Sequence, residues 1–180
     1  MVAITTSFPT IQSLDDWMQH PPDRTEWIAG QLVEKNGMTL KHSRIQAKLA
    51  TYWRNFLSTQ QVAGEVYTEV PCCTEGRGRS PDVAYLTPEL VDRYGNETVL
   101  PQSFPLTAEI ISPTDYAEDV IAKGLEYLRT GALEVWLVYP EVGWVVVMTE
   151  ETRQIFVSGD TVATKMVLSG FQLAVDEFLK

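Results

Sequence analysis

Two acidic residues stand at the ends of apolar segments, where an isolated carboxylate is costly to bury. Asp82 follows a proline in "GRSPDVAYL" and begins a run of apolar and aromatic residues. Glu109 lies inside "FPLTAEIIS", where the alternation of a strand places Thr107 and Ile111 on its own face. Two carboxylates brought together at strand ends repel each other unless a divalent metal lies between them. The pair therefore predicts a site for a divalent metal.

Simpler interpretations of these acids stay open. Each carboxylate could be a solvated residue at a strand end, or could pair with Arg77, Arg79 or Lys123. Lys123 lies four residues after Asp119 on a predicted helix, and an ordinary i,i+4 ion pair contributes only a few tenths of a kcal/mol. Taken one at a time, these residues fit a metal site and ordinary ion pairs equally well.

The spacing of apolar residues predicts two helices that would flank these acids. The first covers residues 41–57, and Lys41, Arg44 and Lys48 form a basic stripe beside its buried face. The second covers residues 115–131 and ends at Gly131. Its apolar positions at helical spacing are Ala117, Ile121, Leu125 and Leu128, and Lys123 lies in a stripe with Val120 and Tyr127.

Strands are predicted on either side of these helices. A hairpin over residues 25–37 turns at Ala29-Gly30. Further strands are predicted at 64–72, 82–86, 104–112, 133–140, 144–150, 153–159 and 170–179, with a polar segment over 87–103. The pattern predicts an α/β fold, or α+β by a strict definition, with a central mixed β-sheet flanked by helices.

Composition limits the class of protein. A chain of 180 residues with 44% hydrophobic residues fits one compact domain over 25–180, preceded by an N-terminal arm over 1–24. The arm carries a short helix capped at Ser13. No apolar run approaches the roughly 20 residues that cross a bilayer, and the start lacks the pattern of a signal peptide. We therefore expect a soluble, cytoplasmic protein with no membrane partner.

The cysteines and the charge narrow the function further. Cys72 and Cys73 are adjacent, which disfavours an intrachain disulfide, and two cysteines cannot build a thiolate zinc site. The net charge of −10 opposes non-specific attraction to nucleic acid. A nucleic-acid partner would therefore have to meet a local basic patch, for which Arg79 and the basic stripe are the candidates.

The chain resembles the Uma-two family of restriction endonuclease-like proteins, within the PD-(D/E)XK nuclease superfamily. The resemblance rests on "SPDVAYL", "PLTAEIISPTDYAEDVIAKGLEYLRTG" and "EVWLVYP", and extends to "TEWIAGQLVE", "KHSRIQAKLA" and "SGFQLAVDEF". No single piece is specific, but the ordered set is hard to produce by chance.

This resemblance implies a restriction-endonuclease-like core with its carboxylates at one edge of the sheet. Asp82 and Glu109, with the backbone carbonyl of Ile110, would hold Mg²⁺ or Mn²⁺. The usual lysine of the superfamily would fall at Ile111, whereas the Uma-two pattern places a lysine on the following helix, at Lys123. The remaining candidates are Glu34 or, less favoured, Glu26 as an extra metal ligand, and His42, Arg79 and Asp119 near the phosphate or behind the ligands.

The function implied is metal-dependent hydrolysis of DNA phosphodiester bonds by an endonuclease, as a homodimer if both strands of a duplex are cut. Two alternatives belong to other classes. One is a nuclease-fold binding protein without catalysis, which Ile111 and the acidic surface favour. The other is a metal-dependent hydrolase of small phosphorylated substrates, for which an acidic surface is less of an obstacle.

Overall fold

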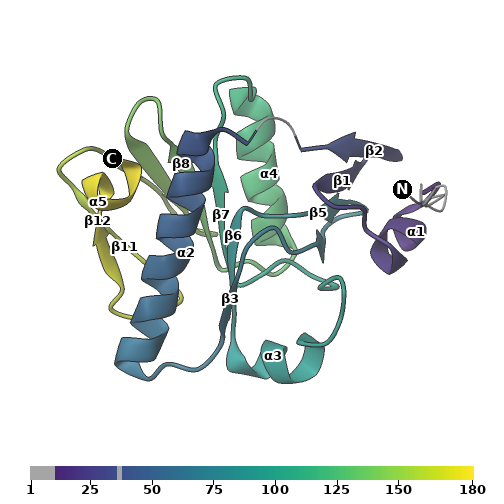
Figure 1. Cartoon of the computed structure of the whole chain (residues 1–180), viewed down its shortest axis with the longest axis horizontal. Coiled ribbons are helices and arrows are strands. Elements are labelled where there is room, and N and C mark those ends of the chain that lie inside the picture. The colour runs from purple at the N-terminus through teal and green to yellow at the C-terminus, as the bar shows by residue number, and fades with distance from the viewer. Residues whose placement is uncertain (1–10, 36–37) are drawn as a thin grey trace, which may run out of the picture.

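A six-stranded mixed sheet forms the centre of the molecule in the computed structural model, which describes residues 11–35 and 38–180 (Figure 1). In spatial order its strands are β10 (Arg153–Phe156), β9 (Trp144–Met148), β8 (Glu134–Tyr139), β7 (Leu106–Ile110), β6 (Val83–Leu86) and β3 (Glu65–Tyr67). β7 and β8 run parallel, while the other neighbouring pairs are antiparallel. The predicted mixed sheet of an α/β fold is thereby confirmed.

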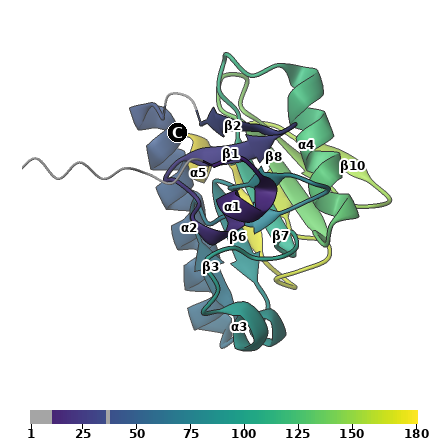
Figure 2. The same cartoon turned by 90° about the vertical axis from the view of Figure 1, so that its right-hand side faces the viewer.

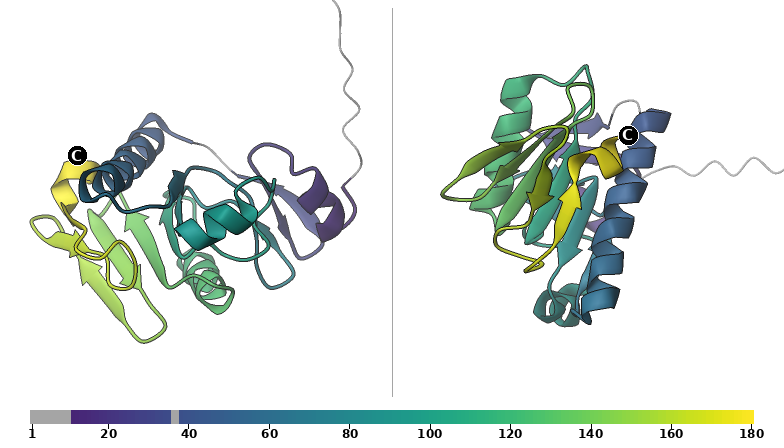
Figure 3. Two further views of the ribbon diagram at one scale, coloured as in Figure 1. Left: turned by 90° about the horizontal axis from the view of Figure 1, so that it is seen from below. Right: turned by 90° about the vertical axis from the view of Figure 1, so that its left-hand side faces the viewer.

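Helices α2 (Leu40–Gln60) and α4 (Ala117–Arg129) cover opposite faces of this sheet (Figure 3). The alternation of β7 separates the two layers, since Ala108 and Ile110 pack with α2 in one apolar cluster. Glu109 faces the other way, toward α4, where Tyr127 is fully buried. A carboxylate in a buried strand thus points at the helix that carries Lys123.

The buried face of α4 differs from the one predicted. The apolar spacing indicated Ala117, Ile121, Leu125 and Leu128 as the buried positions. The structure instead buries Val120, Gly124 and Tyr127, and leaves Ile121 47% exposed. A side chain at Gly124 would place its Cβ 3.0 Å from the sulfur of Met148. The helix therefore makes its closest approach to the sheet at a residue that a search for apolar side chains overlooks.

The hairpin of β1 (Thr25–Ile28) and β2 (Gln31–Glu34) turns at Ala29 and Gly30 as predicted. Both turn residues have positive φ, at 50° and 79°, as a tight two-residue hairpin loop requires. The two-residue loop fixes the register, so that Glu26 lies opposite Val33 and Thr25 opposite Glu34. Residues that face each other share one side of the hairpin, and Glu26 and Glu34 therefore project to opposite sides.

The hairpin belongs to a smaller sheet of order β2-β1-β5-β4, in which β4 is Cys72–Cys73 and β5 is Gly78–Arg79. Helix α1 (Leu14–Gln19) packs on this sheet and is capped by the Ser13 hydroxyl, as predicted (Figure 2). Trp17 is fully buried and donates a hydrogen bond to Thr25, and a Cβ at Gly78 would lie 2.3 Å from its ring. The predicted arm residues 1–10 lie outside the described residues.

The remaining segments depart from prediction in three places. The polar segment 87–103 contains a helix, α3 (Pro88–Tyr94). The strand predicted at 64–72 stops early, because Glu69 adopts a left-handed conformation with φ of 57°. The last predicted strand divides into β12 (Gln172–Ala174), which pairs with β11 (Thr161–Ala163) in a separate small sheet, and helix α5 (Val175–Leu179). Within the described part of the chain, no helix is long and apolar enough to span a membrane.

Candidate active site

Asp82 and Glu109 come together where β6 and β7 lie side by side. Val83 pairs with Ala108 in the antiparallel ladder, so one further step of the register sets the two acids opposite each other. The carboxylate of Asp82 also accepts a 2.7 Å hydrogen bond from the backbone amide of Ile110. Both acids are buried, with 2% and 6% of their surface exposed. Their predicted convergence at one sheet edge is therefore present in the fold.

Lys123 reaches this point from α4. Its ammonium lies 2.9 Å from Glu109 and 2.8 Å from Glu26, and Tyr127 donates a 2.7 Å hydrogen bond to the same oxygen of Glu109. Asp119 is exposed on the first turn of the helix. The alternative of an ordinary Lys123–Asp119 pair is wrong, because the ammonium is directed into the site.

Ile111, at the position where the superfamily's usual lysine would stand, packs beside the apolar cluster between the sheet and α4. It lies on the same face of β7 as Glu109. The ammonium of Lys123 approaches this face from the helix instead, and contacts the carboxylate directly. A lysine from the helix and a lysine from the strand would thus reach the same carboxylate by different routes.

The hairpin contributes Glu26 to the site, and not Glu34. Glu26 is buried and bonds Lys123, the guanidinium of Arg79 at 2.9 Å, and the amide of Ser80 at 3.2 Å. Glu34 is exposed on the opposite side of the hairpin, beside Thr25. The sequence-based preference for Glu34 over Glu26 is therefore corrected, and the reason is the register set by the two-residue turn.

Arg79 is buried between Glu26 and Glu126, and its side chain does not face the solvent. Two of its nitrogens bond the carboxylate of Glu126 at 2.8 and 2.9 Å, and a third bonds Glu26. Arg77 and Thr74 also bond Glu126. Because its guanidinium is buried and fully engaged by carboxylates, Arg79 holds the acids in place rather than offering a free cation to a phosphate.

Lys35 and Glu69 also lie in the site, and the sequence analysis did not identify them. Lys35 donates to Asp82 at 2.8 Å, to Glu69 at 2.7 Å and to the carbonyl of Ser80 at 2.7 Å. The hairpin register contained the signal for Lys35, because the alternation that directs Glu26 inward also directs Lys35 to the same side. Glu69 had no such signal, since it acts from the turn that ends β3.

His42 and Gln46 lie four residues apart on one face of α2 and form hydrogen bonds to Asp82 and Glu69. The Nε2 atom of His42 lies 3.1 Å from Asp82, and the amide of Gln46 donates to Glu69 at 3.0 Å and to the Asp82 carbonyl at 2.9 Å. Hydrogen bonding to Asp82 raises the pKa of His42 against the opposing effect of burial. His42 therefore acts on Asp82, and its contact with a metal or phosphate stays a prediction.

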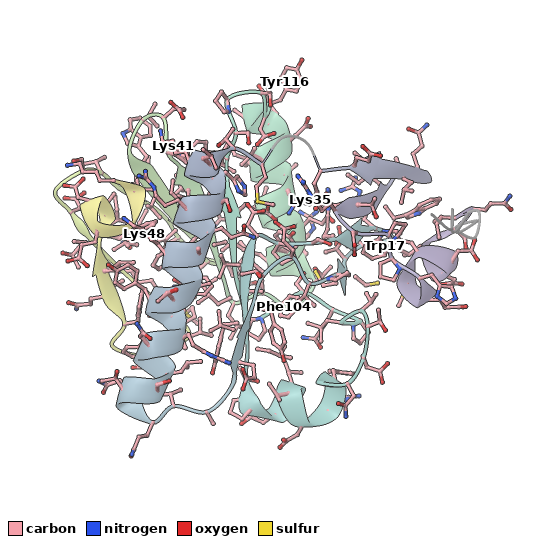
Figure 4. All side chains as sticks on the ribbon, in the orientation of Figure 1. Trp17, Lys35, Lys41, Lys48, Phe104 and Tyr116 are labelled. Atoms are coloured by element: carbon pink, nitrogen blue, oxygen red, sulfur yellow. The ribbon has the colours of Figure 1, made fainter. Side chains whose placement is uncertain are left out.

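The predicted basic stripe of α2 points away from these acids (Figure 4). Lys41 pairs with Glu141, and Arg44 and Lys48 donate to backbone carbonyls in the C-terminal segment. In Figure 4, Lys41 and Lys48 lie on the side of α2 that faces α5, whereas Lys35 lies on the side toward the hairpin. The stripe is thus not a patch beside the site.

Comparison with known proteins identifies a family for this chain and a solved structure with the same fold. Residues 11–176 match the sequence profile of the Uma2 (Uma-two) family, which carries the description "Putative restriction endonuclease". The chain belongs to the Uma2 family. A crystal structure from Anabaena variabilis ATCC 29413, of "a putative nuclease belonging to DUF820", shares the fold with a TM-score of 0.81 and 21% identity, covering 93% of this chain and 97% of that one. No curated protein matches.

The donor set of this Uma2 chain suits a hard divalent cation. Asp82 and Glu109 supply carboxylate oxygens, and magnesium is held in proteins by one or two carboxylates together with substrate phosphates and water. Among the described residues, no group of three His, Cys, Asp or Glu side chains forms a ready-made metal cage. The ammonium of Lys35 lies between Asp82 and Glu69, and that of Lys123 lies between Glu26 and Glu109. Two acids and a backbone carbonyl would be the protein's contribution if a divalent metal binds here.

The two central acids of this Uma2 site have pKa values shifted in opposite directions. Burial raises the pKa of Glu109, and the attraction of Lys123 only partly offsets it. Burial also opposes ionisation of Asp82, but hydrogen bonding to His42 and the charge of Lys35 outweigh it and lower its pKa well below the usual range. Asp82 is therefore firmly ionised, whereas burial disfavours the charged form of Glu109.

Glu26 supports a prediction on acid stability. Burial opposes its ionisation, but the charges of Lys123 and Arg79 outweigh it and lower its pKa from 4.5 to about 2. The ionised carboxylate therefore stabilises the fold fully above pH 4.5, and this contribution disappears as the pH falls to about 2. As the pH falls from 4.5 to about 2, protonation of Glu26 should lower the unfolding free energy of the wild type by on the order of 3 kcal/mol. Glu26→Gln should not show this part of the decrease.

Urea unfolding at several pH values between 4.5 and 2 measures this effect. Glu34→Gln, on the exposed side of the same hairpin, is the matched control and should leave the pH dependence unchanged. An equal loss of stability with acid in wild type and Glu26→Gln would contradict the prediction.

Proposed function

We propose that this protein is a metal-dependent endonuclease that hydrolyses phosphodiester bonds in DNA. The observation that carries the proposal is the convergence of Asp82, Glu109 and Lys123 on one edge of the sheet, with Lys123 2.9 Å from Glu109. Two carboxylates and a lysine are the groups that metal-assisted phosphodiester hydrolysis needs from a protein. Membership of the Uma2 family supports the same reaction class.

Each of these side chains would have a separate role in the hydrolysis. Asp82 and Glu109, with the carbonyl of Ile110, would hold Mg²⁺ or Mn²⁺, which would lower the pKa of a bound water and neutralise charge on the phosphate. Lys123 orients the attacking water and shields the growing negative charge of the transition state. The water oxygen forms a bond to phosphorus while the bond to the leaving oxygen breaks; the water gives up a proton to solvent, and the leaving oxygen takes one from solvent. Tyr127 and Glu26 hold Glu109 and Lys123 in place through the contacts described above.

A second candidate is hydrolysis of small phosphorylated substrates, and the distribution of charge favours it. The arginines and lysines expected to attract DNA are engaged within the protein, Arg79 by Glu126 and Lys41 by Glu141. With a net charge of −10, an extended polyanion meets more repulsion than a small substrate does. Substrate size therefore separates the two candidates.

The test combines metal binding with a substrate panel. We expect calorimetric titration to show binding of Mn²⁺ and Mg²⁺, and cleavage of supercoiled plasmid in their presence but not in EDTA. Short duplexes, single strands and mononucleotides tested side by side locate the substrate class, and light scattering shows whether the active species is the predicted homodimer. No metal binding at millimolar concentration would overturn the proposal in favour of a nuclease-fold binding protein.

A further inference from the structure

The ammonium of Lys35 occupies a site built from oxygen atoms alone. It lies 2.8 Å from Asp82 Oδ1, 2.7 Å from Glu69 Oε2 and 2.7 Å from the backbone carbonyl of Ser80. These oxygens come from two places in the chain, the turn at Glu69 and the segment 80–82, and the lysine arrives from the end of the hairpin. Figure 4 shows Lys35 in the region between α4 and the hairpin.

These oxygens are held in place independently of Lys35. Gln46 bonds both the second oxygen of Glu69 and the backbone carbonyl of Asp82. The second oxygen of Asp82 is held by His42 and by the amide of Ile110. Two carboxylate oxygens and a carbonyl oxygen in a preformed arrangement are ligands that a hard divalent cation prefers. The arrangement is therefore a cation site whose occupant is part of the chain.

Asp82 connects this site to the proposed metal site. Its Oδ1 faces Lys35, and its place in the chain, one residue before the pair Val83 and Ala108, sets it next to Glu109 on the neighbouring strand. Nucleases that use two metal ions place them about 3.5–4 Å apart, bridged by shared ligands. If Asp82 also binds a metal, the carboxylate would be shared between that metal and the ammonium of Lys35, with the ammonium as a fixed cation in the second position.

We propose that the ammonium of Lys35 permanently occupies the second cation position of this site, between Asp82, Glu69 and the Ser80 carbonyl, so that the protein binds a single divalent ion. The inference rests on the proposed function, and extends it by assigning the metal stoichiometry and a positioning role to Lys35. The lysine supplies a positive charge beside Asp82 that no chelator can remove.

Counting bound metal in variants tests the role of Lys35. We expect wild type to bind about one Mn²⁺ per chain, and Lys35→Met, which leaves the three oxygens without a cation, to bind about two. Calorimetry gives the stoichiometry, and the paramagnetic signal of free Mn²⁺ gives it independently. The double variant Lys35→Met with Glu69→Gln loses one carboxylate ligand and should return to about one.

Lys41→Met is the matched control. Lys41 also bonds one carboxylate and one carbonyl, those of Glu141 and Pro140, but the pair is exposed and has no second acid. Its replacement should leave the stoichiometry unchanged. If Lys35→Met does not fold, Lys35→Gln keeps amide donors to the same oxygens without the charge, and should also gain one ion.

The outcomes separate this inference from the proposed function. The gain of one ion on removing the charge of Lys35, starting from a wild type that binds one ion or none, carries the inference. An unchanged stoichiometry in Lys35→Met or Lys35→Gln would overturn it, as would two ions in wild type, and cleavage by the wild-type enzyme would stand in both cases. A wild type that binds no ion, with a variant that binds one, would overturn the proposed function but retain Lys35 as the occupant.

Discussion

Glu109→Gln should strongly reduce metal-dependent cleavage without destabilising the protein. The glutamine oxygen can still accept the hydrogen bonds of Tyr127 and Lys123. Since burial raises the pKa of Glu109, the metal-free fold tolerates an uncharged group there. The metal, however, loses an anionic ligand. We expect cleavage to fall by on the order of 10³-fold, and metal affinity to fall by more than the roughly 100-fold that loss of an outer hydrogen-bond partner costs.

Asp82→Asn provides the contrast that makes this result specific. Asp82 is ionised and bonds Lys35, His42 and the amide of Ile110. Its replacement leaves the buried ammonium of Lys35 with one carboxylate fewer, and breaking a buried pair costs about 3–5 kcal/mol. We expect both variants to lose metal binding in calorimetry, but only Asp82→Asn to lose stability in urea. Cleavage by Glu109→Gln at the wild-type rate would exclude the metal role of Glu109.

Lys123→Met should separate catalysis from metal binding. The ammonium competes with a metal for Glu109, so its removal should leave metal affinity unchanged or increase it. The charge that shields the transition state is lost, and cleavage should fall by about 10²–10³-fold. Glu26 retains its bond to Arg79, which limits the loss of stability. Single-turnover cleavage at saturating metal, together with calorimetry, measures both effects.

Restoring a lysine on the strand tests the position of this charge. Ile111 shares a face of β7 with Glu109 and lies beside the apolar layer under α4. In the Lys123→Met background, Ile111→Lys places an ammonium within reach of the same carboxylate. We expect this double variant to regain part of the lost cleavage, whereas Ile111→Met in the same background regains none. Equal activity of the two double variants would show that Lys123 acts in some other way than by its charge beside Glu109.

Local sequence determined much of the architecture. A two-residue turn with positive φ at Ala29 and Gly30 determined the hairpin and its register, because few residues adopt that conformation. Alternation in β7 placed Glu109 opposite the apolar face of the strand, and the side-chain oxygen of Ser13 determined the start of α1. Asp82 and Glu109 were predicted to meet because each stands near the end of a predicted strand, whereas Lys123 was added to them by the resemblance to the Uma-two family.

Tertiary structure alone decided which cation compensates which acid. Charged side chains carry no periodic signal for their partners, so the sequence could not show that Arg79 would turn inward to Glu126 or that Lys35 would bridge Asp82 and Glu69. The buried face of α4 also depended on packing, since Gly124 allows an approach to Met148 that no apolar spacing reveals. Local propensity thus determined where the acids stand, while long-range packing determined how their charge is balanced.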